Sequence, residues 1–129
     1  MADVAVAATA MAANTAYAAY TMGSGEAIDA TGTTVITPAG PIEEMVIMVI
    51  NTTAAEKVTT LAIGDNPPAN AAGIGTVTLT LGTGNVTPTF GFFGPLSSSR
   101  FIQNDGTVHL THASSMTGFV LAFQVSRKA

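Results

Sequence analysis

The chain has 129 residues, the length of one domain, and about two-thirds of its surface can be buried on folding. Charged residues make up only 9% of the sequence, with four Lys and Arg against eight Asp and Glu, so the net charge is −4. This composition excludes a phosphate-neutralising groove, which needs many basic residues, and we expect no nucleic-acid partner. The absence of Cys excludes disulfides and Cys-based zinc sites. With 47% hydrophobic residues and so little charge, the composition indicates a surface that other copies or partners cover.

The N-terminal stretch is Ala-rich and nearly uncharged. Asp3 is the only charged residue before Glu26, so the basic segment of a signal peptide is missing. Thr and Asn interrupt the apolar run, which argues against a spanning helix, and we expect no membrane association. We predict an N-terminal arm over residues 1–25, extended or partly ordered, with a first strand near Thr15–Thr21. The alternatives are a structural strand of the sandwich, a short helix over Val4–Ala13, because Ala favours helix, and a flexible tail.

From Glu26 onward the sequence is typical of β-structure. Turn signals rich in Gly, Pro, Asn and Asp recur roughly every 8–12 residues, which is the spacing of a sandwich or barrel. We predict an all-β fold over residues 26–129, a single β-sandwich or jelly roll of about eight antiparallel strands. The expected strands are Met45–Ile50, Lys57–Ile63, Thr76–Leu81, Val86–Phe93, Arg100–Gln103, Thr107–Thr111 and Phe119–Val125.

Hydrophobic patterning predicts the core. Met45–Ile50 shows no alternation, so we expect a central strand that is buried on both faces. Thr76–Leu81 and Phe119–Val125 alternate, so their apolar positions should face inward. Asn104–Gly106 predicts a type I′ hairpin turn. The expected core residues are Val46–Ile50, Val77, Leu79, Leu81, Phe119, Leu121 and Phe123.

Candidate catalytic and metal-binding groups are few. His109 and His112 are three residues apart on an expected strand, so they should point to opposite faces rather than share a metal. Glu43 and Glu44 are adjacent and should diverge, which argues against a catalytic carboxylate pair. The serines at 97–99 lack a nucleophile-elbow motif, and the short Gly-rich runs open no helix for phosphate. We therefore expect no enzyme, no catalytic residues, no cofactor and no metal.

Contact residues are better candidates. Arg100 could pair with a carboxylate of a neighbouring molecule or within its own chain. Phe92 and Phe93 are adjacent, so one of them should be exposed and available as an anchor. The apolar N-terminal residues could order against a partner. The predicted interface residues are Met1, Val4, Val6, Met11, Tyr17, Tyr20, Phe92 and Arg100.

Several runs of the sequence carry a family resemblance. They are Ala27–Gly32, Ile36–Pro41, Val49–Thr53, Ala62–Ala69, Phe93–Leu96 and Ser99–Thr107. Together they resemble small structural proteins encoded near the capsid genes of tailed bacteriophages, over roughly residues 27 to 125. The most specific pieces are Gly64–Ala69 and Arg100–Thr107.

The resemblance implies a head decoration, or cement, protein. Such a protein is a β-sandwich that binds the major capsid protein on the outer surface of the capsid, commonly as a homotrimer, and often uses an N-terminal arm. No catalytic residues come with this resemblance. The alternative is a tail or fibre module that binds a host glycan. That function favours exposed Trp or Tyr, whereas the chain has no Trp and only Tyr17 and Tyr20.

Overall fold

The computed structural model describes residues 3–11, 26–64, 76–87, 89–94, 96 and 101–125. Within these residues the fold is all-β, as predicted. It contains ten strands and one short 3-10 helix, η1, over Ile42–Glu44. The strands are β1 Val4–Ala7, β2 Thr9–Met11, β3 Glu26–Ala27, β4 Thr34–Thr37, β5 Met45–Asn51, β6 Lys57–Leu61, β7 Val77–Leu81, β8 Thr89–Phe93, β9 Val108–His112 and β10 Gly118–Val125.

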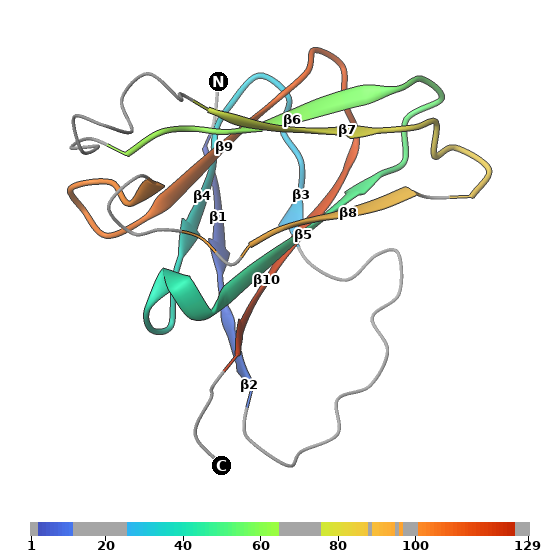
Figure 1. The fold of residues 1–129 in the computed structure, drawn as a ribbon. Coiled ribbons are helices and arrows are strands. Elements are labelled where there is room, and N and C mark those ends of the chain that lie inside the picture. Colours follow the sequence, from blue (N-terminus) through green and yellow to red (C-terminus); the bar gives the residue numbers. More distant parts are fainter. Residues whose placement is uncertain are drawn as a thin grey trace.

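The strands form two sheets that pack as a sandwich (Figure 1). The first sheet has the order β1-β4-β9-β6-β7. The second has the order β2-β10-β5-β8, and β3 also pairs with β10. Two pairs are parallel, β1 with β4 and β2 with β10, so the expectation of purely antiparallel strands is wrong. Partners of a parallel pair need a long crossover between them, and each of these pairs joins segments far apart in the chain.

The N-terminal residues that the structure describes are part of the sandwich. β1 pairs with β4 in the first sheet, β2 pairs with β10 in the second, and Ala8 lies between them. Val6 is only 4% exposed and packs in the core. The prediction of a separate arm is therefore wrong for residues 3–11. The alternative of a helix over Val4–Ala13 is also wrong over β1 and β2. The predicted strand Thr15–Thr21 lies outside the described residues.

The residue types of this segment explain why it forms a strand of the sandwich. Val4 and Val6 alternate with alanines along β1, and β-branched residues at every second position suit a half-buried strand. Extended backbone groups must find hydrogen-bond partners, and β4 supplies them. The amide of Val4 donates to the Thr33 carbonyl at 2.9 Å, and the amide of Ala8 donates to the Thr37 carbonyl at 3.0 Å.

The core lies between the two sheets, and both contribute fully buried side chains to it. The first sheet supplies aliphatic residues from β4, β6 and β9, and the second supplies them from β5 and β10. The loop after β9 adds one methionine. The largest fully buried apolar side chains of the core are Ile36, Ile42, Met45, Ile47, Val49, Leu61, Val108, Leu110, Met116 and Val120.

Part of the predicted core is wrong. Val77 is 37% exposed at the start of β7, although Leu81 on the same strand is buried. Val46, Met48, Phe119 and Phe123 are only partly buried. On β5 and β10 both alternating sets of side chains are apolar, so the pattern alone does not decide which set faces the opposite sheet. In the structure, Ile47, Val49, Val120 and Ala122 face the core. The alternating set that contains Phe119 and Phe123 lies on the opposite face of the sheet.

Two local features hold the sandwich together at its ends. Gly91 on β8 lies against Leu79 and Leu81 of β7; a methyl group added at Gly91 would approach the Leu79 Cδ2 atom to 2.6 Å. The buried Asn51 side chain donates to the carbonyls of Ala55 at 3.2 Å and Gly82 at 2.7 Å, which ties two loops to the end of β5. These contacts keep β7 and β8 close although they belong to different sheets.

The turn before β9 differs from the predicted hairpin. The amide of Gly106 donates to the Gln103 carbonyl at 2.9 Å, and Gly106 has a φ of 85°. Asp105 does not have a positive φ, since Ser115 is the only described non-glycine residue that does, so the turn is not type I′. The Asp105 carboxylate instead accepts bonds from the hydroxyl and amide of Thr107, which lower the pKa of this carboxyl group.

Candidate functional site

The outer face of the second sheet is apolar across three strands. Met48 of β5 lies between Leu121 of β10 and Phe92 of β8, and the next row places Ile50 between two phenylalanines. Alternation along each strand puts these side chains on one face, opposite the core. We call this set the outer apolar face; it comprises Val46, Met48, Ile50, Phe90, Phe92, Phe119, Leu121 and Phe123. Ile50 and Leu121 are almost completely buried, whereas the other members are partly or strongly exposed.

Two aromatic side chains of the outer apolar face are strongly exposed. Phe90 is 56% and Phe92 is 60% exposed. Both lie on β8, which is an edge strand of its sheet. Together with Met48 and Phe123 they line a shallow, open depression of about 380 Å³. Among the described residues, no charged side chain lines it. Exposed aromatic rings around such a depression are typical of contact surfaces, because their burial removes much apolar area from water.

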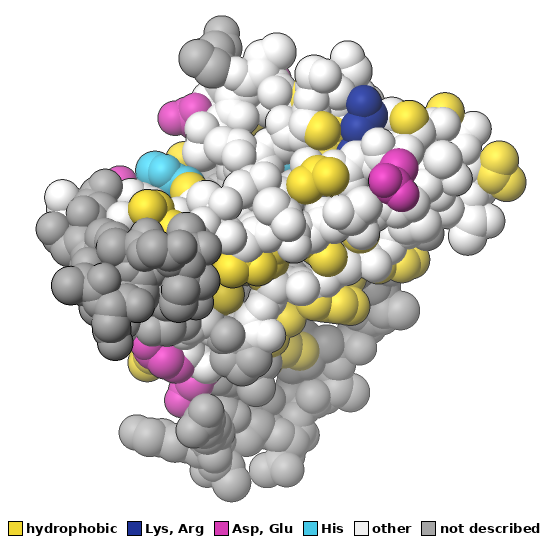
Figure 2. All heavy atoms as spheres, turned by 45° about the horizontal axis from the view of Figure 1, so that its top comes forward, with side chains coloured by type: hydrophobic (Ala, Val, Ile, Leu, Met, Phe, Trp, Pro, Cys, Tyr) yellow, Lys and Arg dark blue, Asp and Glu magenta, His cyan; other side chains and the backbone are white. Residues whose placement is uncertain are grey.

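Charge is sparse on the rest of the surface as well. Figure 2 shows hydrophobic side chains scattered among uncharged polar ones, with few charged groups on that view. Lys57 is the only Lys or Arg in the described part of the chain, and its Nζ donates to the Ser114 carbonyl at 2.8 Å. Contacts with a partner would therefore depend mainly on apolar and neutral polar groups.

The two histidines lie on opposite faces of β9, as predicted. His109 faces outward, where its Nε2 lies 3.1 Å from the Thr107 hydroxyl, and His112 faces the interior. Within the described residues no group of three His, Asp or Glu side chains could hold a metal ion. Glu43 and Glu44 lie on η1, directly before β5.

His112 takes part in a buried hydrogen-bond chain. The Thr59 hydroxyl lies 3.0 Å from the Nδ1 atom of His112 and 3.6 Å from the sulfur of Met116. The Nε2 atom of His112 shares a hydrogen bond of 2.8 Å with the Thr34 hydroxyl. Burial lowers the pKa of His112 to about 4, since a charged ring would lose its hydration there. Both ring nitrogens have partners in the fold, so His112 has a structural role.

The predicted interface residues are only partly brought together. Phe92 is exposed and Phe93 is buried, as the adjacency argument required. Val6 is a core residue, which corrects its assignment as a contact residue, while Val4 and Met11 are half-buried in β1 and β2. The remaining four, Met1, Tyr17, Tyr20 and Arg100, lie outside the described residues.

The sequence pattern did not predict most of the outer apolar face. Phe90 and Phe92 are two residues apart, so on a strand they must share a face, and this signal was available. Met48 and Phe123 join them only through the register of β5 with β8 and β10. The face is therefore a product of strand pairing between segments that are distant in the sequence.

Comparison with known proteins identifies no relative of this chain. No protein-family model, curated protein or solved structure matches the chain. A search of the described residues for a helix of sufficient length and hydrophobicity to cross a membrane finds none.

Proposed function

We propose that this protein is a non-enzymatic structural protein of a virus particle, which decorates the outer surface of a tailed-phage head and stabilises the shell. The observation that carries the proposal is the outer apolar face, with Phe90 and Phe92 more than half exposed. Contiguous exposed apolar patches on soluble proteins usually mark interaction sites. The motif resemblance to phage structural proteins gives the partner, the major capsid protein.

The low charge supports the same function. A decoration protein needs many modest contacts that are summed over a symmetric lattice, and multivalent attachment gives high avidity without a strong individual site. Small neutral side chains lose little conformational entropy when they are buried. A rigid sandwich also holds its contact residues in a constant geometry.

We also propose that the protein acts as a homotrimer on the particle. A cyclic trimer presents three identical copies of a contact surface to a threefold or quasi-threefold position of a shell. Light scattering of the purified protein and imaging of decorated particles test this assembly. A monomer both in solution and on the particle would contradict it.

The binding function is tested with the double variant Phe90→Ser, Phe92→Ser. Undecorated heads of the encoding phage are mixed with protein, and bound protein is measured by co-sedimentation and electron microscopy. Loss of two aromatic anchors should weaken binding at least about tenfold, since such anchors typically contribute more than about 1 kcal/mol each.

Val86→Ser is the matched control. Val86 is 89% exposed in the loop before β8 and lies outside the outer apolar face, so its change should leave binding intact. Full binding by the double variant would exclude the outer apolar face as the contact surface. Failure of the unmodified protein to bind the heads would contradict the proposed function itself.

A further inference from the structure

A second feature of the surface is a break in the pairing along one side of β10. On this side β10 pairs with β3 at Phe119 and Val120 and with β2 from Phe123 to Val125. Leu121 and Ala122 lie between these partners and have no paired residue there in the part of the chain that the structure describes. A pocket of about 180 Å³ opens at this break, between β10 and the neighbouring β1.

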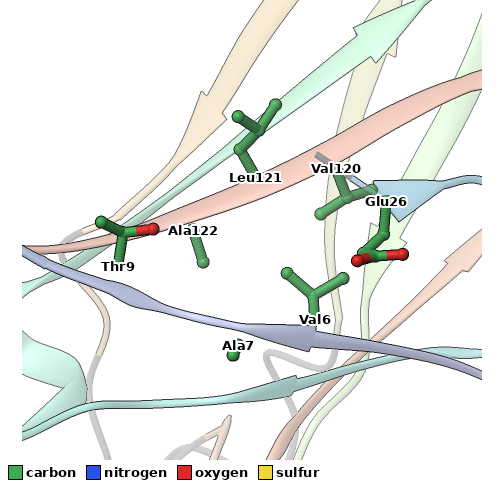
Figure 3. Close-up of a pocket in the computed structure, with 7 residues that line it drawn as sticks. All are labelled: Val6, Ala7, Thr9, Glu26, Val120, Leu121 and Ala122. Carbon is green, nitrogen blue, oxygen red and sulfur yellow. The ribbon is translucent and has the colours of Figure 1, made fainter. Parts of the chain in front are cut away.

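The pocket has an apolar floor and a polar rim. Val6, Val120 and Ala122 form the floor and are almost completely buried, whereas the methyl group of Ala7 lies on the opposite side of β1. Figure 3 shows Val6 pointing up from β1 and Val120 and Ala122 pointing down from β10, whereas Leu121 points away. The Glu26 carboxylate lies at one end of this space and the Thr9 side chain at the other.

The carboxylate of Glu26 is available for a ligand. In the described part of the chain no hydrogen bond or ion pair engages it, and the only Lys or Arg there, Lys57, binds the Ser114 carbonyl. The chain carries a net charge of −4, so an incoming cation meets no opposing net charge. Glu26 is exposed at the rim of the pocket, so an ammonium group can reach its carboxylate from solvent.

The size of the pocket restricts the ligand. Pockets for small-molecule ligands usually measure about 300–1,000 Å³, whereas this one measures about 180 Å³. It is therefore suited to a single side chain. A lysine fits the chemistry, because its flexible aliphatic stem packs on apolar surface while its compact ammonium group binds a carboxylate.

We infer that this pocket binds a lysine side chain of a partner protein, with the ammonium group on Glu26 and the aliphatic stem along Val6 and Ala122. The Thr9 hydroxyl, at the opposite end, is placed to bind the peptide group of the incoming residue. The inference goes beyond the proposed function, because any protein that presents a protruding lysine could use the pocket.

The test uses the full-length protein labelled with ¹⁵N and two probes, N-acetyl-lysine methylamide and its norleucine analogue. The probes share a backbone and an aliphatic stem, but only the first carries the ammonium group. We expect saturable amide shifts at Ala7, Glu26 and Ala122 with the lysine probe at millimolar concentration. The norleucine probe should bind at least fivefold more weakly.

Glu26→Gln should reduce affinity for the lysine probe at least fivefold and leave the rest of the spectrum unchanged. Glu56→Gln, at an exposed carboxylate in the loop before β6, is the matched control and should bind as the unmodified protein does. Equal binding of both probes, absence of saturable shifts at the pocket, or unchanged affinity in Glu26→Gln would overturn the inference. No viral particle takes part, so this outcome is independent of whether the protein decorates a head.

Discussion

The two faces of the second sheet are built from the same kinds of residue and have different environments. On β5, Ile47 and Val49 are fully buried against the first sheet, whereas Met48 between them is only partly covered. On β8, Phe93 is buried and Phe92 is 60% exposed. An apolar strand face thus has two possible outcomes, a core or an interface, and the outcome depends on whether a second layer covers it.

The comparison has an energetic consequence. Burial of apolar area contributes about 25 cal/mol per Å² to the free energy of folding or association. On the inner face this contribution already stabilises the folded chain. On the outer face much of it remains available for association. Mutations on the two faces should therefore separate stability from binding, and the following predictions test this separation from the largest expected effect to the smallest.

Deletion of residues 2–11 should abolish cooperative folding. It removes β1 and β2, one edge strand from each sheet, and it takes Val6 out of the core. The measurement is thermal unfolding by circular dichroism, with Ala5→Ser at an exposed position of β1 as control. A truncated protein with a native-like transition would show that this segment is a dispensable arm.

Ile47→Ala should lower the free energy of unfolding by about 2–5 kcal/mol, because it leaves a cavity in the core. Met48→Ala, the adjacent position on the outer face, should cost less than half as much, since the Met48 side chain is already partly solvated. Denaturant unfolding of both variants gives the comparison. Equal losses would show that the two faces of β5 do not differ in packing.

Acid should destabilise the fold through His112. Its pKa is lowered from 6.5 to about 4 in the folded protein, so between these values the unfolded state binds more protons. Stability is therefore complete above pH 6.5 and falls as the pH approaches 4, by about 2–3 kcal/mol after allowance for partial solvation. The pKa values of the Asp29 and Asp105 carboxyl groups are also lowered, so these groups affect stability only at a pH below this range.

The variant His112→Gln should remove most of this pH dependence between pH 6.5 and 4, while His109→Gln on the opposite face should retain it. Denaturant unfolding at several pH values measures the slope. The same slope in His112→Gln as in the unmodified protein would mean that other groups cause the acid sensitivity.

Phe92→Ser should change the free energy of unfolding least, by less than about 1 kcal/mol, because the ring is mostly solvated in the isolated chain. Its effect should instead be weaker binding to undecorated heads, measured by co-sedimentation. A stability loss as large as that of Ile47→Ala would place Phe92 in the core and remove the distinction between the faces.

The sequence by itself determined the local features of this protein. Alternation and β-branched runs predicted β5, β6, β7, β9 and β10 to within a few residues, because strand preference depends on nearby side chains. The opposite orientations of Phe92 and Phe93, and of His109 and His112, followed from the two-residue period of a strand. The loop position of Gly106 followed from its tolerance of positive φ.

Only the tertiary structure decided the environment of each face. Which alternating set of β10 faces inward depends on the first sheet, and the burial of His112 depends on Thr34 and Thr59, 78 and 53 residues away. The parallel pairing of β1 with β4 likewise joins distant segments. The outer apolar face and the pocket beside Glu26 arise the same way, from the register of strands that contact one another only after folding. Local patterns specify the strand, and long-range pairing specifies its neighbours, because apolar side chains are attracted to any covering layer without regard to its position in the chain.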